Sequence, residues 1–171
     1  MTLGLAVGNK DGIYLAIDSL ALSAASERSL QSKIHDLQAK PLAVLLTAGG
    51  LEHWSDVVSR YRPQSTIKAS TSEVMRILDQ CMQTQNQAFG LLCAYEDGIP
   101  RCYRINRSVG DQSTSIREEN ISVSQPLGTH AIAFAAAREA DSAIQDGRNM
   151  LVALVGAIQA RITGPETEGP I

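Results

Sequence analysis

The chemistry that this chain could perform begins at its second residue, Thr2. Threonine is small enough to permit removal of the initiator Met1, which would leave a hydroxyl and an amine on adjacent carbons of one residue. An α-amine has an ordinary pKa of about 8, so it can accept the hydroxyl proton near neutral pH. Thr2 could therefore supply both nucleophile and base, although many chains begin Met-Thr without any functional meaning.

Two charged residues further along could support such a threonine. Asp18 directly follows the apolar Ile17, and a carboxylate at the end of a core strand needs a partner because burial of an unpaired charge is costly. Lys33, beside Ile34, is the nearest downstream cation with an apolar neighbour. A lysine next to Thr2 would favour the alkoxide and keep the neighbouring amine unprotonated. A surface lysine and a strand-end aspartate are the commoner explanation for such a pair.

A pair of glycines, Gly49 and Gly50, stands between an expected strand and an expected helix. Glycine lets the backbone approach a substrate closely, and an amide at such a corner can point at a developing oxyanion. A tight strand-to-helix turn explains the same two glycines equally well.

The elements that must position these residues follow from hydrophobic periodicity. Alternating apolar residues and an Asp-Gly turn predict a β-hairpin at the start of the chain, and helical spacing with a Ser-Glu capping box predicts helices later. The expected strands are Thr2–Val7, Ile13–Ile17, Leu42–Thr47, Leu91–Tyr95, Cys102–Ile105 and Ile121–Gln125. The expected helices are Leu51–Tyr61, Ser70–Gln85, Ala131–Ile144 and Arg148–Arg161, and the expected loops are Ser23–Ser29 and Ser108–Asn120.

This order of strands, two helices, strands and two helices predicts an α+β fold with antiparallel sheets. Two hairpin-built sheets stacked face to face, with a helix pair on each outer face, would bury every apolar stripe. We therefore expect a four-layer αββα sandwich that forms one domain over residues 1–171, with residues 163–171 as a frayed tail. The segment Met150–Ile158 is apolar around most of its circumference, which fits either burial against the sheet or an interface in an oligomer.

Composition excludes several classes of protein. The 171 residues are 44% hydrophobic and carry 15 Lys and Arg against 18 Asp and Glu, without a basic block, so nucleic acid is a poor candidate for a partner. No apolar stretch reaches the roughly 20 residues of a membrane span, and no export signal is recognisable. Three cysteines without CxxC spacing indicate reduced cytosolic thiols, and the histidines are not spaced as metal ligands. We expect a cytoplasmic protein without metal or cofactor.

Taken together, the first fifty residues resemble a known family. The segments Thr2–Val7, Leu15–Ser19 and Leu46–Gly50, with the Asp11-Gly12 turn and Lys33-Ile34, look like the N-terminal half of proteasome β-type subunits and their bacterial proteasome-like relatives. These are threonine peptidases of the N-terminal-nucleophile hydrolase superfamily. The second half resembles the family more loosely, through a hairpin around Asp97-Gly98 and the segment Pro126–Thr129.

The resemblance implies the N-terminal-nucleophile hydrolase fold and a set of roles. Thr2 would be the nucleophile, Asp18 and Lys33 its charge partners, and Gly49 the oxyanion amide, while the hydroxyl of Thr129 would hydrogen-bond the N-terminal amine. The family's substrates are peptides or unfolded proteins. Its subunits assemble into stacked rings around a chamber, and an ATPase partner feeds many of them. The substrate groove would be lined by Leu20, Leu22, Gly49, Gly50 and Leu51.

Some positions depart from the family's pattern. Leu20 and Leu22 stand where an arginine and a threonine are usual, His130 replaces a glycine, and the final helix offers no acid at the matching place. Loss of supporting residues can cost orders of magnitude in rate when it loosens geometry. The sequence thus predicts a threonine-type peptidase within a proteasome-like ring. Its nucleophile would be the N-terminal threonine that removal of Met1 exposes. The alternatives are a non-catalytic or weakly active assembly subunit and a small-amide hydrolase of the same superfamily.

Overall fold

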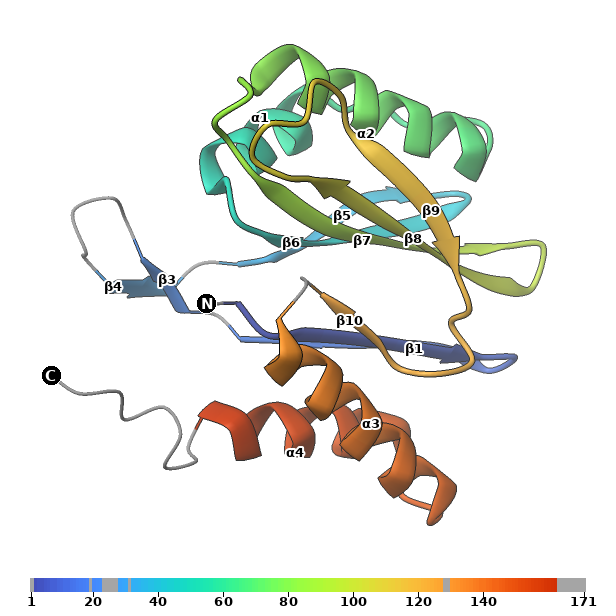
Figure 1. Cartoon of the computed structure of the whole chain (residues 1–171). Helices are drawn as coiled ribbons and strands as arrows, with labels where there is room; N and C mark the ends of the chain where they lie inside the picture. The colour runs from blue at the N-terminus through green and yellow to red at the C-terminus, as the bar shows by residue number, and fades with distance from the viewer. Residues whose placement is uncertain (1, 19, 23–27, 31, 128–129, 163–171) are drawn as a thin grey trace, which may run out of the picture.

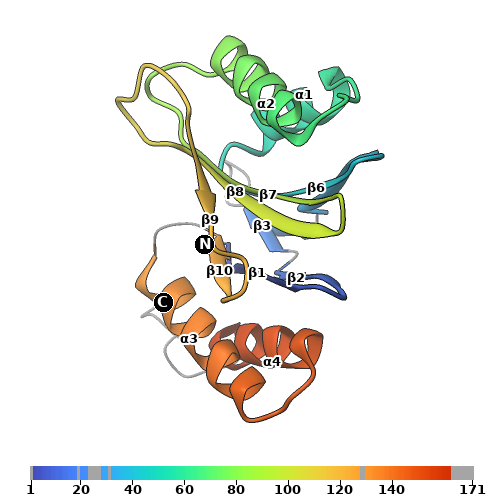
Figure 2. The same ribbon diagram turned by 90° about the vertical axis from the view of Figure 1, so that its right-hand side faces the viewer.

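A computed structural model of the chain describes residues 2–18, 20–22, 28–30, 32–127 and 130–162, with the backbone alone for residues 20–22, 28–30 and 51. Two sheets lie face to face between two pairs of helices (Figures 1 and 2). Helices α1 (Leu51–Arg60) and α2 (Ile67–Cys81) cover the outer face of one sheet. Helices α3 (Ala131–Gln145) and α4 (Met150–Ile162) cover the outer face of the other. The predicted α+β architecture with two antiparallel sheets and four helices is confirmed.

The two sheets differ in width. The larger sheet has the strand order β5-β6-β7-β8-β9, and the smaller sheet has the order β10-β1-β2. The larger sheet consists of β5 (Ile34–Ala39), β6 (Leu42–Ala48), β7 (Ala88–Glu96), β8 (Ile99–Arg107) and β9 (Ser115–Glu119). The smaller sheet consists of β1 (Gly4–Asn9), β2 (Gly12–Ile17) and β10 (Gln125–Leu127). Strands β3 (Leu20–Leu22) and β4 (Arg28–Leu30) form a separate antiparallel ribbon.

Three apolar cores hold the layers together. One joins α1 and α2 to the larger sheet around the fully buried Trp54, and one joins α3 and α4 to the smaller sheet through alanines of α3. The third core lies between the sheets, where Leu46 and Leu91 of the larger sheet meet Leu127 of the smaller sheet. Every layer is thus covered on its apolar side, which is the arrangement that the hydrophobic stripes of the sequence require.

Most predicted elements are present within a few residues of their expected ends. The structure confirms the N-terminal hairpin of β1 and β2, the strand β6 and the hairpin of β7 and β8. It also confirms the helices α1, α3 and α4. Part of each expected loop is a strand. Within the segment 23–29 the strand β4 begins at Arg28, and within the segment 108–120 Ser115–Glu119 forms β9. The strand expected at Ile121–Gln125 forms later, as β10.

The predicted capping box at the start of α2 is wrong. The helix begins at Ile67, and the side chain of Thr66 accepts a hydrogen bond from the Ala69 amide as the N-cap. Ser70 lies inside the first turn, where its hydroxyl is buried and accepts a hydrogen bond of 2.9 Å from the Tyr61 hydroxyl. The helix ends at Cys81 and not near Gln85. A serine used for tertiary hydrogen bonding therefore imitated a cap in the sequence.

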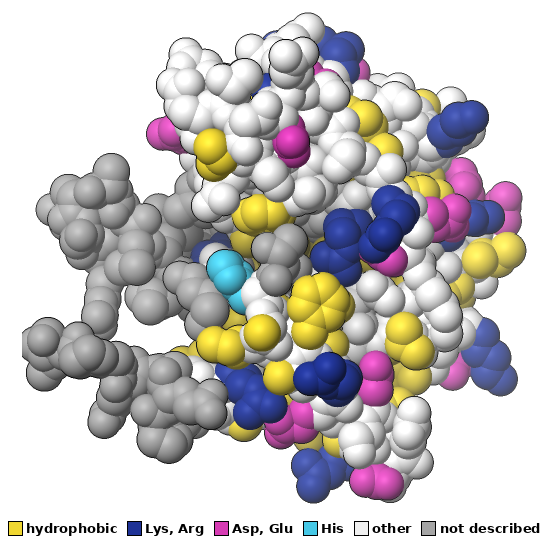
Figure 3. All heavy atoms as spheres, in the orientation of Figure 1, with side chains coloured by type: hydrophobic (Ala, Val, Ile, Leu, Met, Phe, Trp, Pro, Cys, Tyr) yellow, Lys and Arg dark blue, Asp and Glu magenta, His cyan; other side chains and the backbone are white. Residues whose placement is uncertain are grey.

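The outer surface bears charges of both signs. On the face shown in Figure 3, lysine and arginine side chains alternate with acidic ones and with scattered apolar side chains. None of the helices in the described ranges combines the length and the apolar character needed to cross a membrane.

Candidate active site at the start of the chain

The first described residues are fixed against the end of β2. The Asp18 amide donates a hydrogen bond of 2.9 Å to the Leu3 carbonyl, and the Leu3 amide donates in return to Oδ2 of the Asp18 carboxylate. These bonds continue the β1–β2 pairing beyond Gly4 and Ile17. The structure therefore places the backbone of Thr2 beside the Asp18 side chain.

A buried lysine connects Asp18 to Thr2. The Lys33 ammonium donates hydrogen bonds of 2.7 Å to Asp18 Oδ1 and 3.1 Å to Thr2 Oγ1. Lys33 is 2% exposed, and the Asp18 side chain is 8% exposed. The side chains of Thr2, Asp18 and Lys33 thus meet in one cluster, in which the ammonium and the carboxylate are buried. A charge-assisted bond from an ammonium to a hydroxyl oxygen favours the ionised form of that hydroxyl.

The backbone of Lys33 is tied to the larger sheet. The Thr47 amide donates a hydrogen bond of 2.9 Å to the Lys33 carbonyl, extending the β5–β6 ladder by one step. The Thr47 hydroxyl lies 3.2 Å from Nε2 of His35, and burial lowers the pKa of His35 below its usual value. The lysine therefore spans the gap between the sheets, with its main chain in one and its ammonium at the edge of the other.

The glycine pair forms the turn from β6 into α1. Gly49 and Gly50 have φ values of 64° and 51°, and a Cβ atom on them would lie 3.2 Å and 2.9 Å from the Gln87 carbonyl oxygen. Trp54 Nε1 donates a hydrogen bond of 3.2 Å to the Ala48 carbonyl just before the turn. Backbone conformation and close packing thus require glycine here, and the turn begins two residues after the Thr47 amide that binds Lys33.

The remaining predicted site residues are described only in part. Leu20 and Leu22 belong to β3 and Leu51 begins α1, but their side chains are outside the description. Thr129 lies outside the described residues altogether. The predicted groove and the predicted partner of the N-terminal amine stay predictions.

A cavity next to Asp18 was not predicted. Its volume is about 320 Å³, and it lies between the end of β2 and the C-terminal half of α4. Its lining combines Asp18 with Val155, Ile158, Gln159 and Ile162. The apolar character of α4 was visible in the sequence, but nothing local indicated that this helix ends beside the first strands. Within the described ranges, no three His, Cys, Asp or Glu side chains gather as metal ligands would.

Comparison with known proteins identifies the fold. No family model matches the chain, and no curated protein matches it. Among solved structures, Anbu (ancestral beta-subunit) from Yersinia bercovieri matches with a TM-score of 0.69 and 14% identity over 98% of this chain and 77% of its own. An Anbu Gly-1 mutant from Hyphomicrobium sp. strain MC1 matches with a TM-score of 0.68 and 14% identity over 99% of this chain and 78% of its own. The helical assembly of the Anbu complex from Pseudomonas aeruginosa matches with a TM-score of 0.68 and 13% identity over 98% of this chain and 77% of its own.

These matches correct the resemblance drawn from the sequence. Anbu proteins are among the structures that share the fold, and the matches show no proteasome β-subunit peptidase, so identification of the chain as a proteasome β-subunit or bacterial proteasome-like peptidase was wrong. Short segments around Thr2, Asp18 and Lys33 carried that identification, and they are compatible with more than one group of proteins that share this fold. At 13–14% identity the likeness shows the fold and leaves activity to be argued from the site.

Proposed function

We propose that this chain is a threonine-type peptidase in which removal of Met1 turns Thr2 into nucleophile and base. The observation that carries the proposal is the contact of 3.1 Å between the Lys33 ammonium and Thr2 Oγ1, with Asp18 bound to the same ammonium at 2.7 Å. A buried cation aimed at a hydroxyl oxygen is the arrangement that an attacking threonine needs.

The reaction has two steps that balance protons. In the first, Thr2 Oγ1 forms a bond to the peptide carbonyl carbon, and the hydroxyl proton passes to the α-amine of Thr2. The amine then gives that proton to the departing nitrogen as the peptide bond breaks, leaving an ester on Thr2. In the second step water forms a bond to the ester carbonyl carbon while the amine accepts a proton from the water. The bond between that carbon and Oγ1 then breaks, the amine returns the proton to Oγ1, and the carboxylic acid product leaves.

Lys33 and Asp18 have separate duties in this scheme. The Lys33 ammonium stabilises negative charge on Oγ1 and, as a like charge nearby, disfavours protonation of the α-amine. Asp18 neutralises a lysine that would otherwise be an isolated buried charge, and its second oxygen is held by the Leu3 amide. Asp18 is therefore a positioning residue, whereas Lys33 touches the reacting atom.

Six further residues complete the proposal. We assign the oxyanion amide to Gly49, because its turn begins two residues after the strand position that binds the Lys33 carbonyl. We assign Thr129 as the hydroxyl that bonds the N-terminal amine, and Leu20, Leu22, Gly50 and Leu51 as the groove.

The setting that we propose is a self-assembly that encloses its active sites. An Anbu complex of the same fold forms a helical assembly. Confinement suits a peptidase that acts on flexible or unfolded chains, because an open site would cleave such chains indiscriminately. An ATPase partner that delivers substrate is part of the proposal.

Hydrolysis of a panel of short fluorogenic peptides by purified protein tests the function. Activity should be lost in Thr2→Ala and retained in part in Thr2→Ser, which keeps a hydroxyl next to the amine. Thr84→Ala, at a threonine in the segment after α2, is the matched control and should hydrolyse peptides at the wild-type rate. Equal activity of Thr2→Ala and wild type would contradict the proposal. Loss of Met1 without any hydrolysis would favour the non-catalytic assembly subunit.

A further inference from the structure

Strand β10 is short and flanks the start of β1. It pairs antiparallel with β1, with Leu127 opposite Gly4 and Pro126 opposite Leu5. Thr2 lies two residues before Gly4, so β10 holds the part of β1 that leads to the candidate active site. Proline has no N–H group, and a three-residue strand that contains one forms few backbone hydrogen bonds. The position of β10 therefore depends on side chains that bind it.

Arg104 of β8 binds β10 from the other sheet. Side chains alternate along a strand, so Arg104 lies on the same face of β8 as Cys102, which packs in the core between the sheets. The Arg104 guanidinium donates a hydrogen bond of 2.8 Å from Nη1 to the Pro126 carbonyl and one of 3.4 Å from Nη2 to Oε1 of Gln125. One arginine of the larger sheet thus binds two successive residues of β10.

Glu119 of β9 fixes the orientation of this guanidinium. Arg104 Nε donates a hydrogen bond of 2.7 Å to Glu119 Oε1, and the two side chains are 18% and 15% exposed. Burial raises the pKa of Glu119, but hydrogen bonds from Arg117 and Arg104 outweigh this effect and hold the pKa below its usual value. Because a guanidinium is planar, a carboxylate bound at Nε also sets the directions of the Nη donors.

The nucleophile and the cation of the candidate site belong to different sheets. Thr2 precedes β1 of the smaller sheet, whereas the main chain of Lys33 is bound to the larger sheet through the Thr47 amide. The distance between Thr2 Oγ1 and the Lys33 ammonium therefore depends on how the two sheets are held together.

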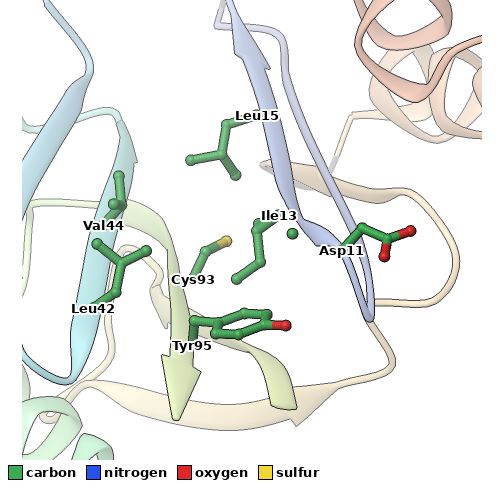
Figure 4. A pocket seen from close by; sticks show the side chains of 8 residues that line it. Asp11, Ile13, Leu15, Leu42, Val44, Cys93 and Tyr95 are labelled. Carbon is green, nitrogen blue, oxygen red and sulfur yellow. The ribbon is translucent and has the colours of Figure 1, made fainter. Parts of the chain in front are cut away.

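Apolar side chains form the core between the sheets. Figure 4 shows Ile13 of β2 projecting toward Cys93 and Tyr95 of the larger sheet. Such contacts are not directional, so they fix the spacing of two layers less sharply than hydrogen bonds do. The Tyr95 hydroxyl donates a hydrogen bond of 2.6 Å to the Lys10 carbonyl, but this bond lies beyond the far end of β1. Arg104 makes the directional contact near the start of β1.

We propose that Arg104 is a positioning residue for Thr2. By holding β10 against the larger sheet, it fixes the start of β1 and with it the distance of 3.1 Å between Thr2 Oγ1 and the Lys33 ammonium. Arg104 acts through the backbone of β10 and β1 and not on the reacting atoms. The inference rests on the proposed function of Thr2.

A second arginine of β8 provides a matched control. Arg101 binds Glu118 of β9 at 2.7 Å, so Arg101 and Arg104 both form an ion pair between the same two strands. An interval of three residues places Arg101 on the opposite face of β8, away from the smaller sheet. Loss of Arg101 thus removes a similar ion pair without affecting β10.

Arg104→Gln and Arg101→Gln, compared in the hydrolysis of one fluorogenic peptide, test this role. Arg104→Gln should lower kcat by about 10- to 100-fold and leave KM within about twofold, because a displacement of about 1 Å can cost up to 100-fold in rate. Arg101→Gln should keep the wild-type values of both constants. Arg104→Lys retains a donor that can bind the Pro126 carbonyl and should recover part of the lost kcat.

The pH profile of kcat/KM separates positioning from a general loss of folded protein. Lys33 and Asp18 are the charged groups beside the Thr2 amine, and Asp18 is bound to the backbone of the same sheet as Thr2. A wider gap between the sheets weakens the repulsion from Lys33, so the pKa of the amine rises toward its ordinary value of about 8. The acidic limb of the profile should therefore lie at higher pH in Arg104→Gln than in wild type. A wild-type kcat in Arg104→Gln, or a lower kcat with the acidic limb unmoved, would overturn the proposal.

Amide hydrogen exchange gives a readout that does not require catalysis. Peptides covering Leu3–Val7 and Gln125–Leu127 should exchange faster in Arg104→Gln than in wild type, and their exchange should not change in Arg101→Gln. Unchanged exchange in Arg104→Gln would overturn the proposal. A wild-type chain that cleaves no peptide contradicts the proposed function, whereas faster exchange in Arg104→Gln would still support the hold of Arg104 on β10.

Discussion

In two ion pairs of this molecule a buried cation binds a carboxylate, and the two pairs differ in the other groups that they bind. In one, the Lys33 ammonium binds Asp18 at 2.7 Å and Thr2 Oγ1 at 3.1 Å. In the other, Arg107, 3% exposed, binds Asp79 at 2.8 Å, and Asp79 Oδ1 also accepts from the amide and hydroxyl of Thr114.

The difference between the pairs separates structure from chemistry. Arg107 also directs donors to the carbonyls of Met82 and Gln112, so its guanidinium joins α2, β8 and the following loop. A planar guanidinium with five donors suits such a junction, whereas a lysine is a compact point charge. The Lys33 ammonium binds the Asp18 carboxylate and the Thr2 hydroxyl at the start of the chain. Burial of a cation and its pairing with a carboxylate do not by themselves indicate a functional site. The two pairs are distinguished by the second acceptor, which is a potential nucleophile for Lys33 and backbone carbonyls for Arg107.

The largest predicted effect is on the rate at which Thr2 reacts. Lys33→Met should lower peptide hydrolysis by roughly 10²–10⁴-fold, because the alkoxide loses its cation. The same variant should destabilise the fold, because Asp18 becomes a buried charge without a partner. Adding Asp18→Asn should restore much of the stability measured by urea denaturation without restoring activity. Activity recovered in the double variant would show that Lys33 acts only on folding.

The second prediction breaks the other ion pair. Arg107→Met should lower the free energy of unfolding by about 2–3 kcal/mol, at the low end of the range for broken buried pairs because Asp79 can be hydrated on its exposed side. Peptide hydrolysis by the folded fraction should stay within about twofold of wild type. A selective loss of activity at unchanged stability would remove the distinction between the two pairs.

A third prediction concerns the support of the glycine turn. A Cβ atom on Gly90 would lie 2.8 Å from the ring of Trp54, the residue that binds the Ala48 carbonyl. Gly90→Ala should therefore cost about 1–2 kcal/mol of stability through overpacking. In Gly12→Ala, the matched control, the added methyl group meets no atom within 4 Å, and thermal denaturation should show a much smaller change.

The smallest prediction is a pH dependence beside the Lys33 anchor. Burial lowers the pKa of His35 from its usual 6.5, so the unfolded chain binds the proton more readily than the folded one. The contribution of His35 to stability is present above about pH 6.5 and declines as the pH falls through its lowered pKa. Thermal denaturation from pH 8 to pH 5 should show a shallower decline in His35→Gln than in wild type. Parallel curves would contradict this account of His35.

The residues of the Thr2 cluster were predictable because each carries a strong local signal. Alternation defined the strand that follows Thr2 and the strand that ends just before Asp18, and a carboxylate at the end of a core strand requires a cation such as Lys33 as its partner. The hollow beside Asp18 was not predictable, because it depends on where α4 ends in space. A contact between two distant segments of the chain produces no periodic pattern in the residues of either segment.

The errors in the fold have similar causes. Strand β9 is rich in charge because it is an exposed edge, and its composition therefore imitates a loop. Ser70 has the sequence context of a helix cap but forms hydrogen bonds with Tyr61 and the Thr66 carbonyl inside the helix. Short motifs also misled the identification of the family, since the first fifty residues resemble proteasome subunits, whereas the fold is shared with solved structures of Anbu proteins.

Intact mass spectrometry after incubation with a peptide epoxyketone most directly tests whether a free amine and its neighbouring oxygen react as one unit. Such a reagent bonds to both groups of a terminal threonine. We predict a protein that has lost Met1 and carries one adduct, with no adduct on Thr2→Ala. A correctly trimmed wild-type protein that stays unmodified would contradict the assignment of Thr2 as the nucleophile.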